Sequence, residues 1–67
     1  MKLLNWKREG KDDLFADTTV GRYEVGLVFS AYTVILRTTL GHDEKIASGL
    51  GFEDAKAAAE QDFQKRR

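Results

Sequence analysis

The sequence has no cysteine and no proline, and it has neither a long apolar run nor an excess of one charge. Without cysteine, the chain has no disulfide and no thiolate ligand for zinc. Without proline, its turns depend on Gly, Asp, Asn and Ser. No segment resembles a membrane span or the apolar stretch of a signal peptide, so we expect a cytoplasmic protein with no membrane partner.

The charge balance bears on the class of partner. Eleven Lys and Arg residues match eleven Asp and Glu residues, whereas proteins that bind nucleic acids usually carry a basic excess on one face. The chain of 67 residues predicts a single domain, 1–67, with a folded composition of 42% hydrophobic and 33% charged residues. Because a core of this size supplies only about 3–5 kcal/mol, a homodimer stays open as an additional source of stability.

Alternating apolar and polar residues predict four to five short strands. The segment 22–28 alternates most clearly, with Tyr23, Val25 and Leu27 on one face, and Gly26 is expected to mark a bulge. Phe29-Ser30-Ala31 is expected to form an unusual turn, and hairpin-length connections make neighbouring strands antiparallel. The remaining strands are expected at residues 3–8, 14–19 and 32–39, with a short last strand at 45–48 before a flexible 49–51.

The C-terminal segment predicts a helix from Phe52 to Arg66. Acidic residues occupy its first turn and basic residues its last turn, continuing to Arg67, which suits the helix dipole at both ends. At 100° per residue its apolar stripe consists of Phe52, Ala55, Ala59 and Phe63. The predicted fold class is α+β, an antiparallel β-meander of four to five strands packed on one C-terminal helix.

No motif in the sequence predicts catalysis, a cofactor or a metal. His42 is the only histidine and lies in a turn, and the carboxylate pairs at 12–13 and 53–54 lack the ligand spacing of a calcium loop. The glycines at 49–51 lack the lysine and hydroxyl residue of a phosphate-binding loop. We therefore expect a protein that is not an enzyme and has no catalytic, cofactor-binding or metal-binding residue.

One helix covers only one face of a sheet, so the other face meets water or a partner. An apolar patch with a charged rim is typical of a protein-interaction surface, although scattered surface hydrophobic residues are also normal. Exposed sheet edges offer a second route, by strand addition. The residues expected to point away from the helix and to bind another protein are Phe15, Arg22, Glu24, Val28, Thr33, Ile35 and Arg37. On the second strand two sets stay open, either Leu14, Ala16 and Thr18 or the more polar Phe15, Asp17 and Thr19, and polarity favours the second set as the outer one.

The alternative function is a small nucleic-acid-binding module that uses the open sheet face. Aromatic side chains on a sheet can stack on bases, and arginines can contact phosphates. The aromatic residues available for this are Phe15, Tyr23, Phe29 and Tyr32.

The segments at 18–25 and 53–63 carry a resemblance. They look like those of small phage and prophage-type bacterial proteins, which have a Trp-bearing first strand, a Gly-Arg-Tyr hairpin and an Ala-rich terminal helix. Some such phage proteins inhibit host defence systems, including CRISPR–Cas. The resemblance therefore implies an inhibitor that binds a host protein or complex, and it transfers no functional residue because the matching positions form the fold.

Overall fold

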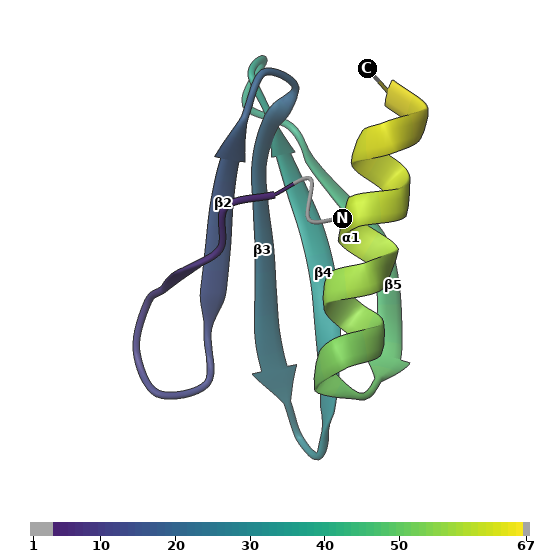
Figure 1. Cartoon of the computed structure of the whole chain (residues 1–67). Coiled ribbons are helices and arrows are strands. Elements are labelled where there is room, and N and C mark those ends of the chain that lie inside the picture. The colour runs from purple at the N-terminus through teal and green to yellow at the C-terminus, as the bar shows by residue number, and fades with distance from the viewer. Residues whose placement is uncertain (1–3, 67) are drawn as a thin grey trace.

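The structure, a computed structural model, describes residues 4–66, so Leu3 and Arg67 of the expected first strand and basic tail lie outside it. It confirms an α+β fold with a five-stranded antiparallel sheet in the order β1-β2-β3-β4-β5, followed by one helix (Figure 1). Each strand pairs with the next, which is a meander. The elements are β1 Lys7–Arg8, β2 Leu14–Thr18, β3 Gly21–Val28, β4 Ala31–Thr38, β5 Asp43–Leu50 and α1 Phe52–Arg66.

The first strand is much shorter than the predicted 3–8. Only Lys7 and Arg8 pair with β2, whereas Leu4 is buried and Trp6 packs against the core. Before β1, the described chain therefore crosses the helix side of the sheet (Figure 1). Burying these two large side chains outweighs the backbone pairing that a longer edge strand would gain.

The last strand is longer than the predicted 45–48. The pairs between β4 and β5 run from Tyr32–Leu50 to Arg37–Asp43, so six residues of β4 lie opposite eight residues of β5. The register shifts on either side of Val34 take up the difference, and β5 carries the irregularity of this sheet. Gly49 has a φ of 70° inside the strand, where the sequence predicts a flexible segment. Gly26 does not form the expected bulge, because it pairs regularly with Thr33.

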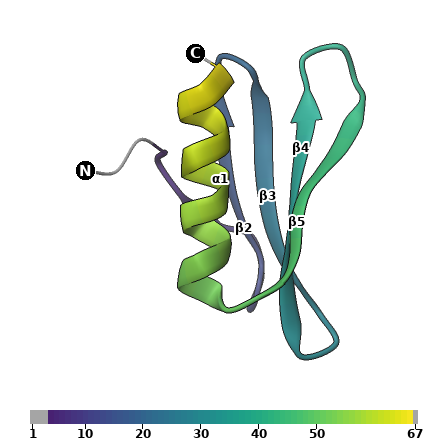
Figure 2. The same ribbon diagram turned by 90° about the vertical axis from the view of Figure 1, so that its right-hand side faces the viewer.

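The core lies between α1 and one face of the sheet (Figure 2). Ala55 and Ala59 of α1 are fully buried, while Phe52 and Phe63 at the two ends of the helix are half-buried. This confirms the predicted stripe of two methyl groups between two rings. The small residues let the helix approach the sheet closely at its middle. From the sheet, the buried residues are Ala16, Tyr23, Val25, Val34 and Leu36.

Aromatic pairs join the two ends of α1 to the sheet. The ring of Phe52 meets that of Tyr32 edge-on at 5.2 Å, and the ring of Phe63 meets that of Tyr23 at 6.2 Å. Such edge-to-face pairs are worth about 0.5–1.5 kcal/mol beyond their buried area. They set the position of the helix along the central strands.

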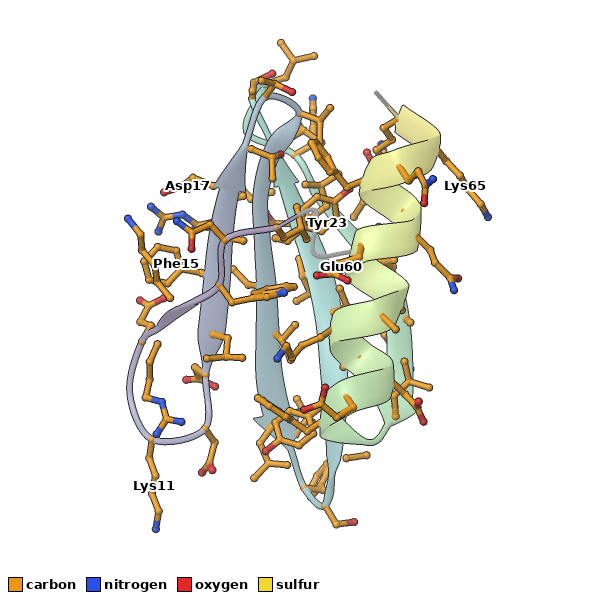
Figure 3. All side chains as sticks on the ribbon, in the orientation of Figure 1. Lys11, Phe15, Asp17, Tyr23, Glu60 and Lys65 are labelled. Atoms are coloured by element: carbon orange, nitrogen blue, oxygen red, sulfur yellow. The ribbon has the colours of Figure 1, made fainter. Side chains whose placement is uncertain are left out.

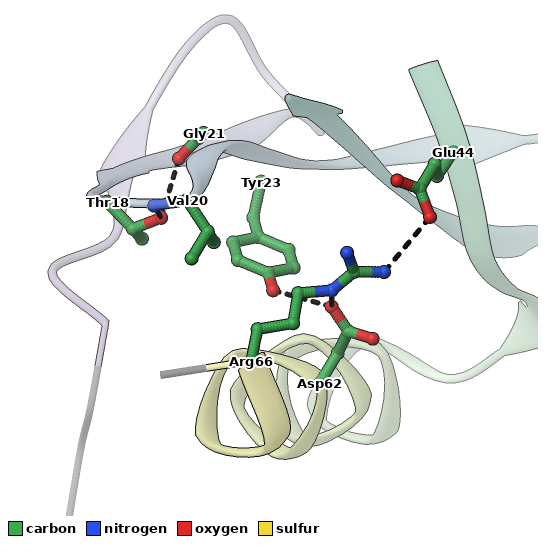
Figure 4. Close-up of polar contacts among 7 residues, drawn as sticks. All are labelled: Thr18, Val20, Gly21, Tyr23, Glu44, Asp62 and Arg66. Carbon is green, nitrogen blue, oxygen red and sulfur yellow. Dashed lines mark hydrogen bonds and ion pairs between the residues drawn. The ribbon is translucent and has the colours of Figure 1, made fainter. Parts of the chain in front are cut away.

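A polar cluster lies beside the C-terminal end of α1 (Figure 4). The Tyr23 hydroxyl donates to Asp62 Oδ2 at 2.6 Å, and Arg66 donates to the same oxygen at 2.6 Å. Arg66 also donates to Glu44 Oε1 of β5 at 3.0 Å, so the cluster links β3, β5 and α1. Burial, followed by the hydrogen bond to Asp62, raises the pKa of Tyr23 well above its usual value.

The β2–β3 turn explains why the Gly-Arg-Tyr hairpin needs its glycine. Gly21 has a φ of 137°, and a Cβ placed there would lie 2.3 Å from the carbonyl oxygen of Arg37. The Thr18 hydroxyl donates to the Gly21 carbonyl oxygen at 2.7 Å and accepts from Val20 N at 3.1 Å (Figure 4). The motif is therefore a requirement of the turn and of the close approach of β4.

We expect Ala59→Leu to destabilise the fold by about 1–3 kcal/mol, because the added side chain overpacks the closest contact between α1 and the sheet. The control is Ala57→Leu, on the exposed side of the same helix, which we expect to change stability by less than about 0.5 kcal/mol. Urea denaturation measures both. Equal stability of the two variants would contradict the assigned helix face.

We expect Tyr23→Phe to cost about 1.5 kcal/mol, because it removes a hydrogen bond to a charged acceptor. The folded-state pKa of Tyr23 is raised above the ordinary value of 10.0, so its contribution is fully present below pH 10.0 and declines above it. The stability difference between wild type and Tyr23→Phe is therefore expected to shrink in alkaline solution. Tyr32→Phe is the control, since its hydroxyl has no hydrogen bond within residues 4–66. A difference that grows with alkaline pH would rule out this role.

Candidate interaction surface on the open sheet face

The sheet face away from α1, the open face, carries all of the predicted partner-binding residues. Alternation along the strands sets this, because Ala16, Tyr23 and Val34 point to the helix and are fully buried. The strand register brings the candidates together across β2, β3 and β4. Figure 3 shows Phe15 and Asp17 on β2, away from α1. The residues are Phe15, Arg22, Glu24, Val28, Thr33, Ile35 and Arg37, and all are half-buried or exposed.

Two arginines lie side by side on this face. Arg22 and Arg37 are register partners on β3 and β4, and like charges in that position repel each other. Each is neutralised by a carboxylate: Arg22 Nε lies 2.7 Å from Asp17 Oδ1, and Arg37 Nε lies 3.0 Å from Asp43 Oδ1. Glu24 adds a weaker contact to Arg37 at 3.7 Å. A row of paired charges therefore crosses the open face from β2 to β5.

These ion pairs are solvent-exposed. The hydrogen bond from Arg22 is the main reason that the pKa of Asp17 lies below its usual value. Exposed pairs of this kind contribute little to stability, because water and salt screen them. Their main effect is to hold the guanidinium groups in defined positions on the surface.

The predicted partner-binding residues do not include Asp17 or Asp43, although both belong to this surface. Asp17 follows Phe15 by two residues, so the period of a strand already places it on the same face. Asp43 gives no such signal, because it lies in a stretch whose composition is typical of a turn. Only the register of β5, which pairs Asp43 with Arg37, brings it here.

The apolar part of the open face is divided in two. Phe15 is covered by Arg22, whose guanidinium carbon lies 4.5 Å from the ring centroid in a cation–π contact. Val28, 51% exposed, and the half-buried Ile35 lie instead beside a hollow at the other end of the face. The accessible apolar surface is therefore concentrated around that hollow.

The hollow has a volume of about 240 Å³ and exists because Gly26 places no side chain on the open face. A Cβ at Gly26 would lie 3.2 Å from Asp13 Oδ1, so the carboxylate already overhangs this position. Val28, Thr33 and Ile35 line the hollow on the sheet. The acidic residues that line it are Glu9, Asp13 and Glu24.

The tip of the β3–β4 hairpin adjoins the hollow through Val28. The turn consists of Phe29 and Ser30 alone, one residue shorter than the predicted 29–31. Phe29 is 98% exposed, and its φ of 60° lies in the left-handed region. That conformation costs a residue with a side chain about 1–2 kcal/mol. Leu27, predicted to face the helix, is 40% exposed because the hairpin extends past the start of α1 (Figure 1).

Two of the four aromatic residues proposed for base stacking lie on the helix side of the sheet, and a third, Phe29, lies at the hairpin tip. Tyr23 is fully buried and hydrogen-bonded to Asp62, and Tyr32 packs against Phe52 on the helix side. Phe15 is on the open face, but Arg22 covers its ring.

Within residues 4–66, no group of three or more histidine and acidic side chains is arranged to hold a metal ion. No helix in that range is long and apolar enough to cross a membrane. Comparison with protein-family models, curated proteins and solved structures gives no match to this chain.

We expect Phe29→Gly to stabilise the fold by about 0.5–1 kcal/mol, because glycine adopts a positive φ without steric cost and the lost ring makes almost no contact. Ser30→Gly is the control and is expected to destabilise, since Ser30 has no positive φ to relieve. Thermal denaturation compares the two variants with wild type. A lower melting temperature for Phe29→Gly would show that the turn is not strained.

Proposed function

We propose that this protein is a non-enzymatic interaction module that binds another protein through its open face. The carrying observation is that α1 covers one face of the sheet, whereas the other presents Val28 and Ile35 around a hollow, beside a row of positioned charges. An accessible apolar centre with a polar rim is the usual composition of a protein-binding surface.

The charges of this surface favour a protein partner over nucleic acid. The hollow is lined by three carboxylates, Glu9, Asp13 and Glu24, which repel phosphate groups. The guanidinium groups of Arg22 and Arg37 are already paired with Asp17 and Asp43. No feature of the open face favours nucleic acid over a protein partner.

We extend the proposal to the kind of partner through the resemblance to small phage and prophage-type proteins. A host protein or complex is the proposed partner, and inhibition of a defence complex such as CRISPR–Cas is the proposed outcome. The segments that carry the resemblance, the Gly21 turn and the Ala-rich α1, have structural roles in this fold. The partner itself is proposed on the resemblance alone.

The test is capture of a partner from bacterial lysate on the immobilised protein. Ile35→Glu puts a charge beside the hollow, and Arg37→Glu reverses a charge in the paired row. We expect both variants to lose the captured partner. Gln61→Glu, on the exposed side of α1, is the control and is expected to retain it.

Circular dichroism on each variant separates lost binding from lost folding. Arg37 is exposed, so its substitution preserves the core even if Ile35→Glu disturbs the sheet. Capture of the same partner by both folded variants, at the wild-type level, would exclude the open face as the interface.

A further inference from the structure

We propose that Phe29 is the anchor of the interaction: its ring inserts into an apolar pocket of the partner protein, and basic side chains border that pocket. This inference rests on the proposed function, because the hairpin tip adjoins the open face through Val28.

The backbone at Phe29 is the first observation. Within residues 4–66, every other residue with a positive φ is a glycine, as at Gly41 and Gly49. Of the two turn residues, only the first, Phe29, has a positive φ. This is the pattern of a type II′ hairpin turn, in which glycine is preferred at the first position. A bulky side chain in such a conformation is an outlier, and outliers of this kind concentrate at functional sites.

The exposure of the Phe29 ring is the second observation. At 98% exposure the side chain contacts almost nothing in its own fold, so its packing does not compensate for the backbone strain. Val28 and Leu27, 51% and 40% exposed, continue the apolar surface from the tip toward the sheet. Aromatic residues, phenylalanine among them, are enriched at protein interfaces, and a few buried anchors supply most of the binding energy.

The charges around the tip determine the class of partner. The β1–β2 loop reaches this end, since Glu9 and Asp13 line the same hollow as Val28, and α1 begins here with Phe52 packed on Tyr32. The β1–β2 loop region, residues 8–13, and the first turn of α1, residues 53–56, together carry five acidic and three basic side chains, although the whole chain is neutral. The acidic residues are Glu9, Asp12, Asp13, Glu53 and Asp54, and the basic residues are Arg8, Lys11 and Lys56.

An acidic surrounding disfavours an anionic lipid surface, which attracts basic segments. It complements a protein pocket bordered by lysine or arginine, and such complementarity speeds encounter and sets the orientation of the complex. The protein partner is therefore favoured over a membrane as the occupant of this tip.

Leu40 provides the matched comparison within the same chain. It is 83% exposed in the β4–β5 turn, which lies at the opposite end of β4 from Phe29. The positive φ in its turn belongs to Gly41, so Leu40 is exposed without strain. An effect that depends on apolar exposure alone would be shared by both positions.

The experiment replaces either Phe29 or Leu40 with the photo-crosslinking residue p-benzoylphenylalanine in the full chain, which is expressed in bacteria and irradiated. We expect a covalent adduct with another protein from position 29 and none from position 40. The crosslinked peptide is expected to map to an apolar pocket bordered by lysine or arginine. With that purified partner, we expect Phe29→Ser to weaken binding about 30-fold or more and Leu40→Ser to leave it unchanged.

Several outcomes would overturn the inference. These are no adduct at position 29, equal adducts at both positions, and a mapped site that is polar or acidic. The protein could instead sediment with phosphatidylcholine–phosphatidylglycerol vesicles, and Phe29→Ser could abolish that sedimentation. This result would show that Phe29 inserts into a membrane and not into a protein. If analytical ultracentrifugation shows a dimer of the wild type and a monomer of Phe29→Ser, the pocket that receives Phe29 belongs to a second copy of this chain.

The two proposals fail in different ways. If Ile35→Glu and Arg37→Glu abolish partner binding while Phe29→Ser does not, the open face is the interface and Phe29 is not its anchor. If none of these variants affects binding, the proposed function fails as well.

Discussion

The close packing of α1 on one face of the sheet is the contact on which the rest of the structure depends. Ala55 and Ala59 have no exposed surface, and only residues this small let the helix lie so near the strands. The contact buries Tyr23, Val25 and Leu36 on that side. Because strands alternate, it also places their neighbours on the opposite face, which no helix of the described chain covers.

The two faces use polar groups in different ways. On the helix side, Asp62 accepts from both Tyr23 and Arg66, and Arg66 reaches Glu44, so three elements are joined by directed hydrogen bonds. On the open face, the arginine–carboxylate pairs are exposed and contribute little to stability. They preserve a defined charge pattern on the surface. The molecule is therefore held together from one side and remains accessible from the other.

The strained hairpin tip at Phe29 adjoins the accessible face and not the packed one. A residue that neither packs nor adopts a comfortable backbone conformation weakens a small domain, whose stability margin is only a few kcal/mol. Phe29 combines both features at the edge of the accessible face. Proteins tolerate such local costs where function requires the residue, and the surrounding strands β3 and β4 are regularly paired and hold the turn in place.

The amino-acid sequence by itself determined α1, its buried stripe and the face on which each candidate of β3 and β4 lies, because helix and strand periodicity are local properties. It left open which face of β2 carries Phe15, and only the burial of Ala16 on the helix side decided this. It did not determine the reduction of β1 to two residues, since burial of Leu4 and Trp6 competes with pairing. Nor did it determine the length of β5, eight residues, because that length depends on the pairing of β5 with β4. The hollow at Gly26 and the pairing of Arg37 with Asp43 were decided only by the tertiary structure, because they require residues distant in the chain to meet.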